Sequence, residues 1–267
     1  MEITNFKGEL AALSAAFLWA ASSTIYGLLG QRIPPLQLNL LKGLIAIALV
    51  GITLILAGET FPEIAFLPVG LLFFSGIVGI GLGDTAYFAA LNQLGARRAL
   101  LVETLAPPIA GLLALLFLGE NLSSGAWFGI LLTILGVAWV IAERAAATAA
   151  LGAHPIRGIV WGIMAAIANA SGAVLSRSAL VESSISPLWS TLLRLVGGIL
   201  MVVLLLALRQ SNSKYSPQRW SIRLFAIIFV TAFGSTYLGI WLQQTSLKFA
   251  PAGIAQTLLA TSPLFVL

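Results

Sequence analysis

The sequence contains no cysteine and only one histidine, His154, which lies in a polar segment. Without cysteine the chain can hold no disulfide framework and no thiolate-bound metal. Charge is also scarce, because 9% of the residues are charged and 59% are hydrophobic, whereas about a quarter of the residues in a soluble globular protein carry charge. With a mean hydropathy of +1.02, the chain is expected to lie in lipid.

Motifs that bind nucleotides or metals are missing as well. There is no phosphate-binding glycine loop of the Walker type, no nucleotide-binding domain and no cluster of histidines and cysteines. ATP-driven transport by this chain alone is therefore excluded, and no cofactor or metal is expected. The net charge of +5 could indicate nucleic acid, but the basic residues are scattered singly between apolar segments, so no nucleic-acid partner is expected.

Long apolar segments make up most of the chain, and each is near the ~20 residues that a helix needs to cross ~30 Å of hydrocarbon. Eight full segments and the start of a ninth lie at about 8–30, 36–58, 67–91, 96–118, 126–142, 158–180, 188–208, 222–247 and from 252 onward. Alternation of polar and apolar residues is absent, and open sheets do not occur in lipid. The pattern predicts an all-α polytopic membrane protein.

An internal repeat divides the chain. The stretch from Gly83 to Pro107 returns at Gly239 to Pro263 after a shift of about 156 positions. The second copy lacks an equivalent of residues 112–141. We predict a first repeat at 1–144, an alanine-rich linker at 145–157 and an incomplete second repeat at 158–267.

Five predicted spans precede the linker, so the second repeat enters the membrane from the opposite face and the two repeats are inverted. A complete second copy would give a ten-helix fold, of which about eight to nine helices are present. The sequence is expected to be a truncated product, or else a partner supplies the missing helices. Tandem repeats in a hydrophobic chain are typical of transporters whose substrate site lies between the halves.

A family resemblance rests on several of these residues. Trp19 in the first span, the run ALNQLGARRALLVETLAPPIAGLLALLFLGE ending at Gly119 and Glu120, and its echo SLKFAPAGIAQTLLATSPLFVL resemble the EamA-type modules of the drug/metabolite transporter superfamily. The resemblance implies ten helices in two inverted five-helix repeats, a cytoplasmic N-terminus and transport of small organic metabolites or drugs. Many such modules carry arginine where this chain has Lys42, as Arg194 does in the second copy.

The charges of the loops predict the opposite orientation. Numbered in order, the odd loops carry Arg32, Arg97, Arg98, Arg144, Arg157, Arg209, Lys214, Arg219 and Arg223. The N-terminus and the even loops carry only Lys7, Arg177 and Lys248. The positive-inside rule would therefore place the odd loops in the cytoplasm and the N-terminus outside.

Four ionisable residues lie inside predicted spans, namely Lys42, Asp84, Glu103 and Arg194. A charge at the centre of a membrane costs about 2.5–3.5 kcal/mol on insertion scales, so each needs a reason to be there. Lys42, Asp84 and Glu103 are expected at roughly 9–12 Å below the same face, which leaves one surplus negative charge. Either Asp84 or Glu103 takes up and releases a proton that drives transport, or Lys42 and Asp84 form only a structural clasp.

The second copy carries neutral polar groups instead, since Ile240 and Leu259 align with Asp84 and Glu103. The groups expected to contact substrate are Asn169, Gln243, Gln244 and Gln256, with Tyr237 and Trp241 as walls. Alternatively, the amides join helices and the tryptophan anchors the interface. Arg194 is expected to bind an anionic group or to pair with Glu182.

Small residues and prolines are expected to shape the bundle. Gly79 and Gly83 lie four positions apart and allow close helix packing. Pro107 and Pro108, and Pro263 in the second copy, interrupt helical hydrogen bonding at equivalent places. Such paired breaks are typical of transport sites or hinges, although plain kinks are an alternative.

The chain is thus predicted to be a secondary active transporter of the plasma or inner membrane. It would export amino acids, other small metabolites or drugs, be coupled to protons, and work as a monomer or homodimer in the lipid bilayer. The alternatives are a non-transporting scaffold or receptor, or an intramembrane enzyme built on Glu103 and Thr104, for which a lone carboxylate is thin support.

Overall fold

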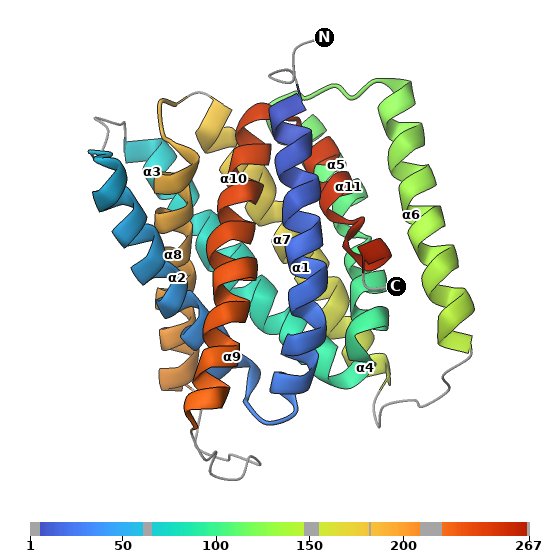
Figure 1. The fold of residues 1–267 in the computed structure, drawn as a ribbon. Coiled ribbons are helices and arrows are strands. Elements are labelled where there is room, and N and C mark those ends of the chain that lie inside the picture. Colours follow the sequence, from blue (N-terminus) through green and yellow to red (C-terminus); the bar gives the residue numbers. More distant parts are fainter. Residues whose placement is uncertain (1–5, 61–65, 147–154, 182, 209–220, 266–267) are drawn as a thin grey trace.

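The computed structural model describes residues 6–60, 66–146, 155–181, 183–208 and 221–265. All secondary structure in these residues is helical (Figure 1). The elements are α1 (Lys7–Gly30), α2 (Pro35–Ala57), α3 (Phe66–Gly76), η2 (Ile77–Asp84), α4 (Thr85–Glu103), α5 (Ala106–Leu118), α6 (Ser124–Ala146), α7 (Pro155–Val181), α8 (Pro187–Leu208), α9 (Ile222–Ala232), η3 (Phe233–Leu238), α10 (Gly239–Phe249), α11 (Ala252–Leu259) and η4 (Ser262–Phe265). Of the η segments, η2 and η3 are π-helical and η4 is a 3₁₀-helix.

Seven of the described helices are long and apolar enough to cross a membrane, some formed by consecutive elements. They cover Lys7–Gly30, Pro35–Ala57, Phe66–Ala96, Arg98–Leu118, Ile156–Val181, Pro187–Leu208 and Ile222–Phe249. The apolar part of α6, Ser124–Gly136, is shorter. The predicted all-helical, polytopic fold is confirmed, whereas the repeat boundaries around 145–157 stay a prediction.

The two halves run in opposite directions, as Figure 1 shows: α1 begins at the end of the bundle marked N, and α7 begins at the other end. We call the end where α1 begins the amino-terminal face, and the end where α1 finishes the opposite face. The end of α10 lies at the amino-terminal face, where Lys7 Nζ is 4.4 Å from the centre of the Phe249 ring. Neither face is assigned to the cytoplasm.

The halves interlock instead of forming separate bundles. Helix α1 packs on α10, α7 packs on α4, and α2 packs on α8, so each of these contacts joins the first half to the second. Fully buried alanines line α1 and α7, including Ala12, Ala15, Ala166 and Ala170. Lipid provides no hydrophobic force between helices, so small residues that let backbones approach stabilise such contacts. The centre of the bundle is therefore built from both halves.

The two π-helical segments begin at equivalent positions, because the repeat shift of about 156 residues carries Ile77 of η2 onto Phe233 of η3. Each segment receives a hydrogen bond from another helix. Asn39 Nδ2 donates to Ile80 O at 2.8 Å, and Trp19 Nε1 donates to Ser235 O at 2.8 Å. Segments of this type are frequent at functional sites in helices.

Two breaks follow each π-helical segment. The first lies at Gly95, whose φ of 75° is accessible to glycine, and at the equivalent Pro251, where α11 begins. The second lies just after Glu103 and Leu259. There, Leu105 N donates to Val102 O at 3.1 Å, and the equivalent Thr261 N donates to Leu258 O at 3.2 Å.

The prolines occupy different places from those predicted. Pro107 and Pro108 lie in the first turn of α5, where the missing N–H groups cost nothing, and therefore start a helix and do not interrupt one. Pro263 lies in η4, beyond the end of α11. The interruption itself falls just before each of them.

Candidate functional site

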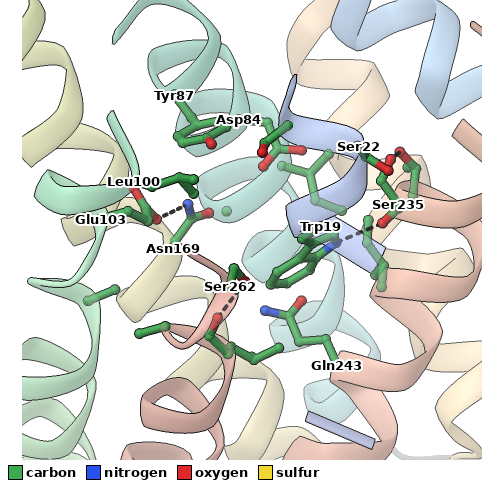
Figure 2. Close-up of a pocket in the computed structure, with 18 of the residues that line it drawn as sticks. Trp19, Ser22, Asp84, Tyr87, Leu100, Glu103, Asn169, Ser235, Gln243 and Ser262 are labelled. Carbon is green, nitrogen blue, oxygen red and sulfur yellow. Dashed lines mark hydrogen bonds between the residues drawn. The ribbon is translucent and has the colours of Figure 1, made fainter. Parts of the chain in front are cut away.

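A cavity of about 150 Å³ lies between the two halves. Its walls come from α1, α2, η2, α4 and α5 of the first half and from α7, α8, η3, α10, α11 and η4 of the second, and Figure 2 shows part of them. The polar and charged residues that line it are Ser22, Ser23, Tyr26, Lys42, Asp84, Tyr87, Glu103, Thr104, Asn169, Arg194, Ser235, Thr236, Gln243, Gln256 and Ser262. The four predicted intramembrane charges are thus brought to one place.

Lys42 and Asp84 form an ion pair within the first half. The Lys42 Nζ to Asp84 Oδ2 distance is 2.5 Å, and the Lys42 side chain is buried beside the ring of Phe88, whose centre is 5.3 Å from Nζ. Each charge therefore compensates the other, as the predicted clasp requires. Asp84 is held by this contact.

Glu103 has a partner from the second half. Asn169 Nδ2 donates to Glu103 Oε1 at 2.6 Å, as Figure 2 shows, while the buried Glu103 Oε2 has no hydrogen-bond partner. The neighbouring Thr104 hydroxyl donates to Leu101 O at 2.6 Å. Thr104 is thus engaged with the backbone and not with Glu103, so the catalytic pair of the enzyme alternative is not assembled.

Arg194 is the charged group of the second half. It follows Pro187 at the start of α8 by the same spacing as Lys42 follows Pro35 at the start of α2. Its side chain is buried, and its Nη1 donates to Gln243 Oε1 at 3.0 Å. Its Nε has no hydrogen-bond partner, and no ion pair with a carboxylate is found for it within the described residues. The predicted alternative partner, Glu182, lies outside them.

The presence of Arg194 corrects the predicted charge balance. The cavity holds two cations, Lys42 and Arg194, and two carboxylates, Asp84 and Glu103, so their formal charges cancel and no surplus negative charge remains. The charge predicted from the sequence counted only Lys42, Asp84 and Glu103, because Arg194 belongs to the other repeat. The packing of α8 against η2 brings it to the same cavity.

Gly79 and Gly83 provide the space in which these groups meet. A Cβ on Gly79 would lie 2.9 Å from Arg194 Nη2 and 4.0 Å from Asn169 Oδ1, and a Cβ on Gly83 would lie 2.7 Å from Asn169 Oδ1. Both glycines also face α7, whose Gly172 comes close to Gly79. Their packing role was predicted, but their proximity to the polar groups was not.

Three predicted contact residues lie away from the cavity. Gln244 accepts a hydrogen bond from Ser190 Oγ at 2.7 Å, and Tyr237 shares one of 2.7 Å with Thr53 Oγ1. Trp241 packs beside Tyr237, with ring centres 6.1 Å apart. These side chains point toward α2 and α8 and do not line the cavity, so their predicted contact with substrate stays a prediction. Gln243 and Gln256 do line the cavity.

Several cavity residues were missed from the sequence. The sequence connected Trp19 only with the family resemblance, yet its indole lines the cavity, as Figure 2 shows. Tyr26 OH is 2.9 Å from Ser235 Oγ. The signal that could have found some of them is a pair of adjacent hydroxyl residues within an apolar span, since Ser22 lies beside Ser23 and Ser235 beside Thr236.

Comparisons with known proteins agree with this architecture. The model of the EamA-like transporter family matches residues 6–142 and again 156–267. No curated protein matches the chain significantly. A solved structure described only as "Crystal structure of protein" aligns with a TM-score of 0.73 and 20% identity, covering 97% of this chain and 85% of its own, which is evidence for the fold alone. The chain therefore belongs to the EamA-like transporter family of the drug/metabolite transporter superfamily, and it is an integral, multi-pass membrane transporter.

Proposed function

We propose that the protein exports small zwitterionic metabolites of the amino-acid type across the inner membrane, and that Glu103 and Arg194 bind the two charges of the substrate. The observation that carries this proposal is that both side chains line one cavity, come from different halves and each keep a buried atom without a partner. A buried polar group without a partner costs about 1–3 kcal/mol. A substrate that satisfies both atoms recovers this cost.

The chemistry of a zwitterion matches these groups. The guanidinium of Arg194 keeps its charge and binds carboxylates through paired N–H donors. Gln256 lines the same cavity, and its Nε2 also lacks a partner, so it adds a further donor. Glu103 Oε2 accepts from a substrate ammonium, while the Asn169 amide fixes the other oxygen.

The size of the cavity limits the substrate. A volume of about 150 Å³ equals that of an engineered apolar cavity that binds benzene. Apolar walls are contributed by Leu100, Ile240 and Leu259, and an aromatic one by Trp19. These dimensions suit a compact metabolite with one short apolar side chain.

Glu103 is also the better candidate for proton coupling. Asp84 is already held by Lys42 at 2.5 Å, whereas Glu103 has no cationic partner among the described residues. If Glu103 binds either a proton or the substrate ammonium, the two compete for one carboxylate. Competition of this kind produces exchange, in which protons enter as the substrate leaves.

The test uses purified protein in liposomes loaded with a labelled amino acid. Efflux should accelerate when the outside is made acidic, and Glu103→Gln should abolish this acceleration while the protein still inserts. Glu9→Gln, a change in the first turn of α1 outside the cavity, is the matched control and should behave like the parent. N-acetylation of the substrate should also stop its transport.

Two results would contradict the proposal. One is full acceleration by acid in Glu103→Gln. The other is equal transport of the free and the N-acetylated amino acid, because a blocked amino group carries no charge for Glu103 to bind.

A further inference from the structure

The amino-terminal face holds the second ion pair of the described residues, and it lies away from the cavity. Arg177, near the end of α7, approaches Glu120, which follows α5, with 2.6 Å between Nε and Oε1. The two side chains are only 13% and 16% exposed. Since α5 belongs to the first half and α7 to the second, this contact ties the halves together.

The pair also holds the junction between α10 and α11. Arg177 Nη1 donates to Leu247 O at 2.9 Å and to Lys248 O at 3.0 Å, and Glu120 Oε2 accepts from Ala252 N at 3.0 Å. Terminal carbonyl and amide groups of helices have no partners within the helix and must find them elsewhere. One ion pair therefore stabilises the end of α10 and the start of α11.

Further hydrogen bonds close the same face. Lys248 Nζ donates to Ile185 O at 2.6 Å, Ser186 Oγ donates to Glu59 Oε2 at 2.6 Å, and Trp189 Nε1 donates to Thr60 O at 3.1 Å. These bonds join the last turn of α10 and the residues after α2 to Ile185 and Ser186, which precede α8, and to the first turn of α8. At the opposite face, the part of the chain that the structure describes contains no ion pair.

We propose that Arg177 and Glu120 form the latch of a gate at the amino-terminal face, closed in this structure and broken when the cavity opens to that face. The released helix would be α11, which contributes Gln256 and Leu259 to the cavity wall. Alternating access requires the halves to separate at one face at a time, so any bond that joins them there must break. Water entering the gate then solvates the two separated charges.

This inference rests on the transporter assignment but not on the identity of the substrate. Its test can be carried out without any substrate. The chain has no cysteine, so a single Ser262→Cys change places one thiol on the cavity wall. A membrane-impermeant thiol reagent is applied to each face of sealed vesicles in turn. Adding Glu120→Gln should raise the labelling rate from the amino-terminal face by about tenfold or more. The substitution leaves the charge of Arg177 buried without its partner, which strongly destabilises the closed state.

The matched control is Glu9→Gln, which removes a carboxylate near the same face without touching the latch and should leave the labelling rate unchanged. Hydrogen exchange provides a second measurement: the amides of α11 should exchange faster in Glu120→Gln, with those of α2 unaffected. Unchanged labelling and unchanged α11 exchange would overturn the proposal. Equal increases in labelling from both faces would also overturn it, because they indicate general loosening.

Discussion

Helices α2 and α8 carry a cation at the same position, and the two cations differ in their partners. Lys42 has Asp84 at 2.5 Å, whereas Arg194 has the neutral Gln243, and the residue that aligns with Asp84 in the second copy is Ile240. The first half thus supplies the counterion of its own cation. The second half keeps a cation that has no carboxylate partner among the described residues, which is the property expected of a group that binds a mobile anion.

Each half also receives a polar contact from the other, in the first half just before its second break and in the second half within its π-helical segment. Asn169 of the second half binds Glu103 of the first, and Trp19 of the first half binds Ser235 of the second. The two contacts are of different chemistry, since one involves a carboxylate and the other a backbone carbonyl. Each inverted repeat therefore depends on a polar group of the other, while of the two only the first carries carboxylates in the cavity.

The largest effect is expected from breaking the ion pair between Lys42 and Asp84. Lys42→Leu leaves the partly buried carboxylate of Asp84 without its partner and should lower the free energy of unfolding by up to about 3–5 kcal/mol. Unfolding in detergent with a chemical denaturant measures the change. The double variant Lys42→Leu/Asp84→Leu should recover most of the loss; if it is no more stable than the single variant, the clasp interpretation is wrong.

The next change would make the second half resemble the first. Ile240→Asp places a carboxylate in the cavity wall at the position that aligns with Asp84, where it should pair with Arg194. Losing the charge-assisted contact to the substrate carboxylate, at about 1.5–3 kcal/mol, should weaken substrate binding by roughly tenfold to a hundredfold. Binding is measured by calorimetry with an amino acid, and Ile240→Asn is the uncharged control. Equal affinity in the Asp and Asn variants would contradict the role of Arg194.

A smaller effect is expected at the point where the two halves meet. Gly79→Ala adds a Cβ 2.9 Å from Arg194 Nη2, so the guanidinium must shift by a few tenths of an ångström. The Michaelis constant for transport should rise by several-fold with little change in maximal rate, because the shift affects binding more than conformational exchange. Gly51→Ala, in α2 with no atom within 4 Å of the added Cβ, is the control.

The smallest effect should come from residues that the structure places outside the cavity. Tyr237→Phe removes the hydroxyl that contacts Thr53 and should cost about 0.5–1.5 kcal/mol of stability, with transport unchanged. Trp241→Phe should also transport normally. An altered substrate preference in either variant would instead support the prediction that these residues contact the substrate.

The amino-acid sequence by itself determined that the chain lies in lipid, that it is helical and that it contains an internal repeat. Apolar segments of the length of a bilayer allow only helices once alternation is absent, and equivalent breaks in both halves follow from residues such as Gly95 and Pro251. The four intramembrane charges were also evident, because a charge in an apolar segment is conspicuous wherever it lies.

Only the tertiary structure decided which side chains face the cavity. A helix in lipid is apolar on every side, so its sequence carries little of the periodicity that marks the inner face of a soluble helix. Gln243 and Gln244 are neighbours in the chain, yet the first lines the cavity and the second bonds to α8. Only the tertiary structure likewise showed that Arg194 belongs to the charges of the cavity. Its location depends on the packing of α8 against η2, a π-helical segment of the other half, and no local sequence pattern predicts this contact.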